Sequence, residues 1–278
     1  MKIGLIGAGR LGICLALLLE QAGHTVVASD IREDYIKSLN EKKINTAEPN
    51  VQKLLSNSTR IKFTKNNSDV IEECDIIFTL VATPSLEDGS YDVSAVEKVV
   101  QDFTTSSSKL KGKSLVIGCT TNPGDCDRFQ KELNYFGVDV YYNPEWIAQG
   151  SIIKDLQKPD MVLIGGNGNH ASDIEKIYMD IVKSNCSVHF MSTKAAEITK
   201  IAVNCYLTTK ISYANQIGQV LTLAGMEGEI DNVLNTIGTD TRIGNKYLKF
   251  GFGLVAHVFL EIIVLLLRMQ KILVYVLI

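Results

Sequence analysis

Three glycines near the start of the chain, Gly7, Gly9 and Gly12, have the spacing Gly-x-Gly-x-x-Gly between an apolar run and a helical pattern. In a strand-to-helix turn, the first glycine allows the tight bend, the second lets a pyrophosphate approach the backbone, and the third lets the helix pack on the sheet. The free N–H groups at the helix start, here Arg10 and Leu11, favour negative charge. The spacing predicts a dinucleotide site, against the alternative of a glycine turn without a ligand.

Asp30 ends the next apolar run, at the place where such sites put the acid that accepts the ribose hydroxyls. A carboxylate there repels the 2′-phosphate of NADP, so the sequence favours NAD as the cofactor. Arg32 lies two residues further on and is suited to pair with a 2′-phosphate. NADP therefore stays open as the alternative.

Three further segments carry side chains suited to catalysis. Thr121 precedes a turn, where a threonine commonly bonds to nearby backbone. Glu145 follows an apolar run, and a glutamate at the carboxyl end of a strand beside a cofactor suits general-base work. Lys200 and Asn204 are four residues apart, so they share one face of a predicted helix. Such a pair is usually solvated surface, but here the flanking apolar residues favour a functional pair.

These residues follow elements that alternate along the first two-thirds of the chain. We predict strands at residues 2–6, 25–29, 75–81, 114–119, 139–142 and 161–164, with crossover helices such as 10–22 and 93–103. Most of the strands are apolar on both faces, as strands covered by helices on two sides must be. The alternation predicts an α/β fold: a Rossmann-type doubly wound parallel sheet over residues 1–190, with ligands at its carboxyl edge.

From Thr193 the pattern becomes helical. Residues 194–224 contain no proline, and no glycine before Gly218. This predicts one long helix, broken or bent at Gly218, and a second helix from about residue 230. Since a long helix after a Rossmann domain commonly forms a dimer interface, we expect by analogy a helical central domain over 191–253 and a homodimer through residues 194–224.

Composition narrows the range of partners. The net charge of −3, without a Lys/Arg cluster, gives no reason to expect nucleic-acid binding. Six scattered cysteines without a CxxC pair indicate reduced thiols in a cytoplasmic protein, with no zinc or other metal site. Arg10 and Gly12 interrupt the first apolar run and Glu20 follows it, so it predicts a buried strand and helix instead of a signal peptide.

Four segments, taken in order, resemble the UDP-glucose/GDP-mannose dehydrogenase family. They are Val81-Ala82-Thr83-Pro84; Cys119-Thr120-Thr121-Asn122-Pro123-Gly124; Asn143-Pro144-Glu145-Trp146-Ile147-Ala148-Gln149-Gly150; and residues 196–204 with Asp240-Thr241-Arg242-Ile243-Gly244. The resemblance runs from residue 1 to 253. It implies an NAD-dependent oxidoreductase that converts the primary alcohol of a nucleotide sugar through an aldehyde to an acid. UDP-glucose, oxidised to UDP-glucuronate for polysaccharide biosynthesis, is the leading substrate, with GDP-mannose and a UDP-N-acetylhexosamine as alternatives.

The resemblance also implies roles for single residues. Thr121 would position a water, Glu145 would assist thioester hydrolysis, and Lys200 would stabilise an oxyanion with Asn204 beside it. The cofactor would contact Gly7, Gly9, Arg10, Leu11, Gly12, Asp30, Val81, Thr83 and Thr121. The nucleotide sugar would contact Glu145, Trp146, Ile147, Lys200, Asn204, Arg242 and Tyr247, with the Arg242 guanidinium on phosphate. Gln149 replaces a second family glutamate, so no role that needs charge is expected there.

The family's nucleophilic cysteine is expected in a Gly-Gly-x-Cys-Phe-Pro-Lys/Arg-Asp loop just after Gly253, but the chain lacks it there. Codons permitted for residues 254–262, read one base out of frame, give Gly-Gly-Pro-Cys-Phe-Pro-Arg-Asp. We therefore expect a one-base deletion near codon 254, a spurious apolar tail over 254–278, and loss of a second Rossmann-like domain. The charges in the tail disfavour the alternative of a membrane-seeking segment. The chain as written is expected not to turn over, and a non-catalytic NAD-binding fragment is the alternative function.

Overall fold

The computed structural model describes residues 1–147, 150–168 and 170–251. These residues fall into two compact units, the first formed by residues 1–84 and 92–198 and the second by residues 85–91 and the chain from residue 199 onward. The division falls inside one long helix, α9 (Thr193–Leu223). Gln149 and the tail over 254–278 lie outside the described residues.

The first unit is built on one eight-stranded sheet in the order β3-β2-β1-β4-β5-β6-β7-β8. Its strands are β1 (Lys2–Ile6), β2 (Thr25–Ser29), β3 (Ile61–Thr64), β4 (Ile76–Thr79), β5 (Ser114–Ile117), β6 (Asp139–Tyr142), β7 (Met161–Gly165) and β8 (Ser187–Met191). Neighbouring strands are parallel except β6 and β7, which pair antiparallel at Tyr142 and Gly165. The prediction of an all-parallel sheet is wrong at this pair. The connection from β6 to β7 contains only the six-residue helix α7 (Ile152–Gln157). The chain therefore returns from the carboxyl end of β6 in the opposite direction, without the crossover that a parallel pair needs.

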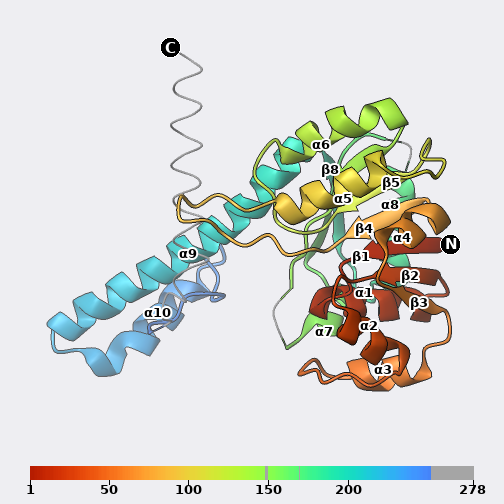
Figure 1. Ribbon diagram of the computed structural model, residues 1–278. Helices are drawn as coiled ribbons and strands as arrows, with labels where there is room; N and C mark the ends of the chain where they lie inside the picture. The colour runs from red at the N-terminus through yellow and green to blue at the C-terminus, as the bar shows by residue number, and fades with distance from the viewer. Residues whose placement is uncertain (148–149, 169, 252–278) are drawn as a thin grey trace, which may run out of the picture. The chain divides into compact units, whose positions relative to one another are not determined.

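Helices cover both faces of this sheet, which confirms the doubly wound Rossmann-type fold. They are α1 (Arg10–Gln21), α2 (Glu33–Asn40), α3 (Val51–Asn57), α4 (Asn67–Glu73), α5 (Ser94–Thr104), α6 (Asp125–Leu133), α7 and α8 (Ala171–Ile181), with a short 3₁₀ turn, η1 (Asn134–Phe136). α1 packs against α7 and α8, whereas α4, α5 and α6 pack together (Figure 1). Residues 12–20 of α1 are all buried, so this helix lies at the centre of the main core.

Two strands of the sheet, β3 and β8, were not predicted, and both form its edges. Each has neighbours on one side only, and every residue of β8 is exposed or half-buried. Edge strands therefore lack the continuous apolar run by which a central parallel strand is recognised.

The second unit holds the part of α9 from residue 199, the 3₁₀ turn η2 (Glu227–Glu229) and α10 (Ile230–Thr239). Its small core joins α9 to α10 and to the segment after α10 through Ala214, Ile230, Leu234 and Leu248. Among the described residues, no helix is both long enough and apolar enough to cross a membrane.

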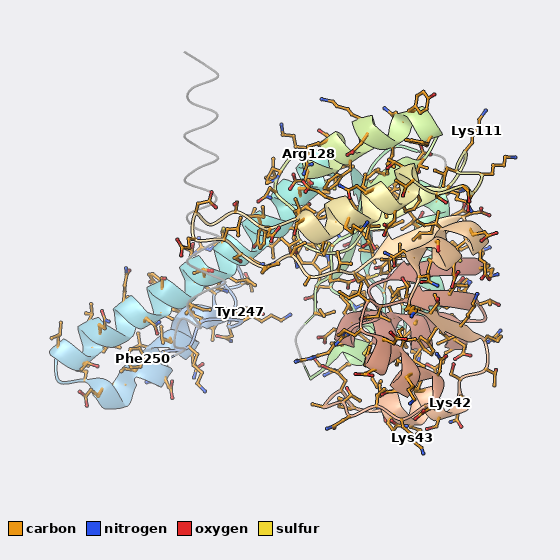
Figure 2. All side chains as sticks on the ribbon, viewed as in Figure 1. Lys42, Lys43, Lys111, Arg128, Tyr247 and Phe250 are labelled. Carbon is orange, nitrogen blue, oxygen red and sulfur yellow. The ribbon has the colours of Figure 1, made fainter. Side chains whose placement is uncertain are left out.

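α9 runs unbroken through Gly218, so the predicted break at this glycine is wrong. A Cβ at residue 218 would lie 1.9 Å from the Phe250 ring (Figure 2). The close packing of an aromatic ring against the helix therefore explains the glycine. A glycine inside a helix lowers the stability of the helix only modestly.

Candidate functional site

The turns after four central strands meet at the carboxyl edge of the sheet. An added Cβ on Gly7, after β1, would lie 2.7 Å from the Leu80 carbonyl oxygen, after β4. A Cβ on Gly118, after β5, would lie 2.5 Å from the Leu80 side chain and 3.5 Å from the Asn143 carbonyl oxygen, after β6. β1 and β4 are also the neighbours between which the strand order reverses, which is where doubly wound sheets bind their ligands.

The glycine turn between β1 and α1 fits a pyrophosphate. Gly7 has φ +98°, which allows the tight bend, and a Cβ on Gly12 would lie 2.1 Å from the Gly7 carbonyl oxygen. Around Gly9, by contrast, an added Cβ would have one atom of the described residues within 4 Å besides its own chain neighbours, Arg32 Nη2 at 3.9 Å. The backbone of Gly9 is thus open to a ligand, and α1 begins immediately after it at Arg10 without a side-chain cap.

Asp30 lies beside this turn, as predicted from its place after β2. The Ser29 carbonyl oxygen accepts hydrogen bonds from the amides of Gly7 and Ala8, both at 2.9 Å, which holds the end of β2 against the turn. The Asp30 side chain is 7% exposed and accepts three hydrogen bonds from Arg32. This pairing was not predicted, although both residues were singled out.

Val81 and Thr83 are half-buried in the segment after β4, next to the end of β1, since the Leu80 amide donates to the Ile6 carbonyl at 2.8 Å. Cys119 lies across from this segment at the end of β5. Burial raises the pKa of the Cys119 thiol to about 12, and the nearby Glu145 carboxylate adds to the increase. The effect of Glu145 on this pKa means that the loop after β6 reaches the same region as the loop after β5.

Glu145, Trp146 and Ile147 line a small cavity of about 20 Å³ after β6. Tyr178 of α8 lines the same cavity, and its pKa is raised well above the usual value by burial and by the charge of Glu145. The structure thus places the predicted general base against the protein interior. The carboxylate is within electrostatic reach of two buried acids that stay neutral at pH 7.

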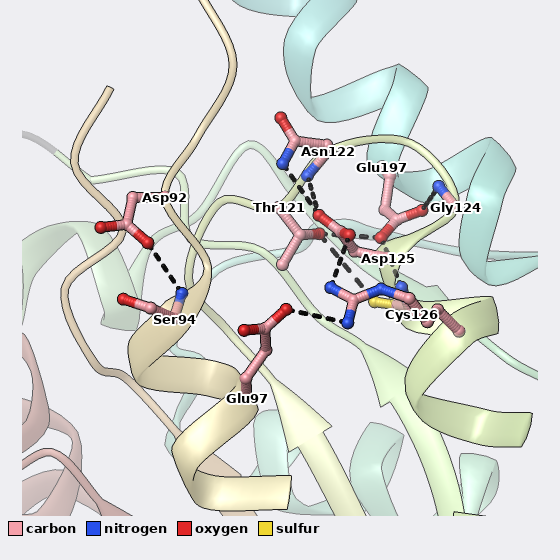
Figure 3. Close-up of polar contacts among 10 residues, drawn as sticks. Asp92, Ser94, Glu97, Thr121, Asn122, Gly124, Asp125, Cys126 and Glu197 are labelled. Carbon is pink, nitrogen blue, oxygen red and sulfur yellow. Dashed lines mark hydrogen bonds and ion pairs between the residues drawn. The ribbon is translucent and has the colours of Figure 1, made fainter. Parts of the chain in front are cut away.

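Thr121 has a fully buried side chain whose hydroxyl donates a 2.8 Å hydrogen bond to Glu197 of α9 (Figure 3). Glu197 is also fully buried, and it accepts hydrogen bonds from the amides of Gly124 at 2.6 Å and Cys126 at 2.9 Å. These amides belong to the start of α6, which has no capping side chain of its own. Burial raises the pKa of Glu197, and the hydrogen bonds from the two amides and from Thr121 offset part of that increase.

Glu197 was missed as a site residue in the sequence. Its signal was that it is the one acidic residue in the predicted helix over residues 194–224 and stands between Ala196 and Ile198. A buried carboxylate needs partners, and here they come from residues more than 70 positions away. Sequence spacing cannot show that link.

The loop between Thr121 and α6 is held by a second set of contacts. Asp125 accepts hydrogen bonds from the amide and side-chain nitrogens of Asn122, both at 2.9 Å. Arg128 donates to Asp125 at 3.1 Å and pairs with Glu97 of α5 at 2.8 Å. The loop after β5 is therefore fixed from both sides.

In the second unit, Lys200 and Asn204 lie one turn apart on α9, and both are half-buried. Arg242 is 87% exposed and forms a two-point contact with Asp240, with Nε donating to Oδ1 at 3.0 Å and Nη2 to Oδ2 at 2.6 Å. Tyr247 is exposed and has φ +64°, an uncommon conformation for a bulky residue.

The segment that carries Arg242 is fastened to α9. Lys210 Nζ donates to the carbonyl oxygens of Ile243 at 3.0 Å and Gly244 at 3.1 Å. Asn215, one turn further along, accepts a hydrogen bond from the Gly251 amide at 3.1 Å. These bonds give both side chains a structural role.

Comparison with known families gives two matches. Residues 1–182 match the NAD-binding domain of the UDP-glucose/GDP-mannose dehydrogenase family, and residues 194–274 match its central domain. The chain belongs to this family. The predicted family and the NAD cofactor are confirmed by the first match, which covers more than half of the chain.

Individual relatives agree with this assignment. UDP-glucose 6-dehydrogenases of Rhizobium meliloti and Pseudomonas aeruginosa are 31% and 28% identical over 91% of this chain, which covers 60% and 58% of their lengths. The solved structure of a UDP-glucose dehydrogenase from Pyrobaculum islandicum has a TM-score of 0.86 and 25% identity, with 98% of this chain and 64% of that one covered. The chain thus spans about three-fifths of the length of these relatives.

Proposed function

We propose that the chain forms the NAD-binding and central parts of a nucleotide-sugar 6-dehydrogenase, with UDP-glucose as substrate and UDP-glucuronate as product. The observation that carries this proposal is the convergence of the glycine turn, the Thr121 loop and the Glu145 loop at one edge of the sheet. The relatives named UDP-glucose 6-dehydrogenase support UDP-glucose. A GDP-mannose dehydrogenase of Pseudomonas aeruginosa, with a TM-score of 0.78, has the same fold, so its substrate class is the alternative.

In this proposal, the glycine turn and Asp30 hold NAD. Arg10 and Leu11 lie at the helix start that receives the pyrophosphate. The other half of the cofactor contacts Val81, Thr83 and Thr121. NAD, when bound, accepts the hydride that leaves the sugar carbon. Glu145 acts as general base from the loop after β6, where its side chain is half-buried. Thr121, the proposed catalytic threonine, is held in place by the hydrogen bond that its hydroxyl donates to Glu197.

Lys200 and Asn204 share one face of α9, and the proposed role of the lysine charge is to stabilise a developing oxyanion. Trp146 and Ile147 follow Glu145 in the same loop and are proposed to contact the sugar. Arg242 and Tyr247 contact the nucleotide, and the exposed Arg242 guanidinium still has N–H groups to offer a diphosphate beyond those directed at Asp240.

We propose further that residues 1–278 bind NAD without completing the reaction. Oxidation of an aldehyde to an acid by this chemistry needs a reactive thiolate. Burial raises the pKa of Cys14 and Cys119 to about 12 and of Cys74 and Cys205 to about 11, and it raises that of Cys126 well above normal. The raised pKa values are typical of unreactive thiols, and the remaining cysteine, Cys186, is half-buried in the connection between α8 and β8.

Two measurements test this function. Calorimetry with NAD and UDP-glucose reports binding, and NADH absorbance reports turnover. We expect NAD to bind and no NADH to form; steady NADH formation at a family-like rate would refute the inactive state. Resequencing codons 250–260 then decides its cause, since an extra base there would restore the cysteine loop, whereas an unchanged frame favours the non-catalytic NAD-binding reading.

We also propose a homodimer through α9. Seven of the exposed positions of this helix repeat with alternating spacings of four and three residues: Ala202, Tyr206, Thr209, Tyr213, Gln216, Val220 and Leu223. Of the large apolar ones, Tyr206 and Val220 are each 61% exposed and Leu223 is 89% exposed. An apolar stripe with this 3.5-residue period is typical of a helix that pairs with another helix.

The dimer is tested by light scattering coupled to size exclusion. We expect a dimer mass for the parent chain and a monomer mass for the double variant Tyr206→Glu/Val220→Glu, which places charges in the stripe. Glu229→Gln, on exposed η2, is the control and should leave the mass unchanged. A monomeric parent chain contradicts the proposal.

A cytoplasmic location belongs to the same proposal. All six cysteines are free thiols, and such a set persists in a reducing compartment.

A further inference from the structure

Glu48 is a buried carboxylate in the connection between α2 and α3, and it contacts the segment that follows β6. Glu48 Oε1 accepts a hydrogen bond from the Gly150 amide at 2.6 Å, and Oε2 accepts one from the Ile152 amide at 3.2 Å. More than 100 residues of sequence separate Glu48 from these two donors. Because a buried carboxylate is unfavourable without donors, the two bonds define a specific contact between distant parts of the first unit.

The connection that carries Glu48 is itself held in place. The Ile44 amide donates to Gln52 Oε1 at 3.0 Å, and Gln52 Nε2 donates to the Lys42 carbonyl oxygen at 2.7 Å. Val51, at the start of α3, is fully buried, and α3 packs against α1. The carboxylate therefore contacts its two donors from a fixed position.

The bond to Gly150 fixes one end of the segment that carries the proposed general base. At the other end, Asn143 is buried, and its amide donates to the Ile117 carbonyl oxygen of β5 at 2.8 Å. Glu145 lies between these two anchors, two residues after the first and five before the second. Fixing both ends of a short segment restricts the backbone conformations available between them. The position of Glu145 therefore depends on the contact of Glu48 with Gly150.

A second connection between Glu48 and Glu145 runs through α7. The N-cap residue of this helix makes no side-chain cap hydrogen bond, and Glu48 instead accepts a hydrogen bond from the first amide of the helix. Leu156 of α7 lines the cavity of about 20 Å³ that Glu145 and Trp146 also line. Since this cavity is small, a shift of α7 would change the packing around both side chains.

We propose that Glu48 is a positioning residue, whose carboxylate holds Glu145 and Trp146 in place by fixing Gly150 and the start of α7. This inference rests on the proposed function, in which Glu145 is the general base and Trp146 contacts the sugar. Removing the carboxylate takes the acceptor from two backbone amides, so the segment between Asn143 and Gly150 should open more often to solvent.

Trp146 provides the test, because it is the only tryptophan in the chain and its fluorescence reports on this segment alone. Acrylamide quenching is measured for the parent chain and for Glu48→Ala, each well below its melting temperature. We expect the quenching constant to rise at least about twofold in Glu48→Ala, because the indole becomes more accessible. Glu48→Gln keeps one acceptor oxygen and should show a smaller rise, and it replaces Glu48→Ala if thermal unfolding shows that the latter is not folded.

Two control variants separate positioning from a general loss of stability. Glu41→Ala removes the same charge from an exposed position in the same connection. Leu133→Ala removes buried apolar atoms from α6, which packs with α5, and should lower the melting temperature. We expect both controls to keep the quenching constant of the parent chain. Parental quenching in folded Glu48 variants, or an equal rise in Leu133→Ala, overturns the inference.

Titration of the parent chain with UDP-glucose tests the proposed function separately. A change in Trp146 emission supports the sugar contact, and Glu48→Ala should then bind UDP-glucose at least about tenfold more weakly. An unchanged affinity in that variant would overturn the positioning role. No change in the emission of the parent chain contradicts the proposed sugar contact, whereas the quenching constants, measured without ligand, still decide whether Glu48 holds the segment.

Discussion

The Thr121 hydroxyl and the Glu197 carboxylate are joined by a 2.8 Å hydrogen bond inside the protein, where both side chains are fully buried. The bond connects the loop after β5 to α9 across 76 residues of sequence. Because the same carboxylate also accepts from the first amides of α6, a single side chain orients the proposed catalytic threonine and caps the helix after it.

Glu197→Ala should therefore destabilise the first unit. The substitution leaves one hydroxyl and two amides buried without an acceptor, and each such group costs about 1–3 kcal/mol. We expect a loss of roughly 3 kcal/mol or more in urea unfolding, and a smaller loss for Glu197→Gln, which keeps one acceptor oxygen. Glu132→Ala, at an exposed position on α6, is the control and should change stability by less than about 0.5 kcal/mol. An equal effect of the two alanine variants would contradict the capping role.

The free energy of unfolding should depend on pH in part through the protonation of Glu197. Its pKa is raised in the folded state, chiefly by burial, so the folded chain holds this proton at pH values where the unfolded chain has released it. The stabilisation is fully present below the ordinary glutamate pKa and is lost as the pH rises through the raised native value. The difference in unfolding free energy between the parent chain and Glu197→Gln should therefore shift toward the parent as the pH falls. A flat difference from about pH 5 to pH 8 would speak against a raised pKa.

Gly9→Ala should weaken NAD binding without lowering stability, whereas Gly12→Ala, three residues away, should lower the stability of the fold. A Cβ at residue 9 meets only open space and the Arg32 guanidinium, so the fold should tolerate it while the pyrophosphate loses its approach. A Cβ at residue 12 meets the Gly7 carbonyl oxygen at 2.1 Å, so the packing of α1 on the sheet should fail. We expect Gly9→Ala to bind NAD at least about tenfold more weakly with an unchanged melting temperature, and Gly12→Ala to lose several degrees of melting temperature. Calorimetric titration and thermal unfolding of both variants give the comparison.

Cys119 should be unreactive despite its place beside Glu145. With a pKa of about 12, only about one thiol in 10⁴ is ionised at pH 8, and that fraction rises tenfold for each further pH unit up to the pKa. We expect iodoacetamide to leave Cys119 unmodified in the folded chain at pH 8 and to label it in urea, as followed by peptide mass spectrometry. Cys186, which is half-buried and free, provides the internal comparison. Rapid labelling of Cys119 in the folded chain would reopen it as a nucleophile.

Lys210→Met should loosen the segment that carries Arg242. The ammonium group bonds to two carbonyl oxygens of that segment, and methionine keeps most of the length of the side chain without the donors. We expect a loss of about 1–2 kcal/mol and faster tryptic cleavage after Arg242. Lys249→Met, at an exposed position nearby, should leave the cleavage rate as it was. If both variants are cleaved alike, the two bonds do not hold the segment.

The sequence by itself determined the class of fold, the cofactor turn and the family. Apolar runs predict the central strands because parallel strands covered on both faces must be apolar throughout, and the glycines around Gly9 are dictated by local backbone geometry. The sequence did not predict the edge strands β3 and β8 or the antiparallel β6–β7 pair, because strand pairing depends on neighbours that are distant in sequence.

Only the tertiary structure decided the partners of the charged side chains. Asp30 was predicted as a ribose acceptor, but its three-bond pairing with Arg32 depends on the turn after β2 and on the stacking of Arg32 over Tyr35. Glu197 looked like one residue of a helix until the fold brought the Thr121 loop to it. Strand patterns and glycine turns depend on residues that are close in sequence, so the sequence predicts them. The donors to a buried carboxylate are brought to it by tertiary packing and can be distant in sequence.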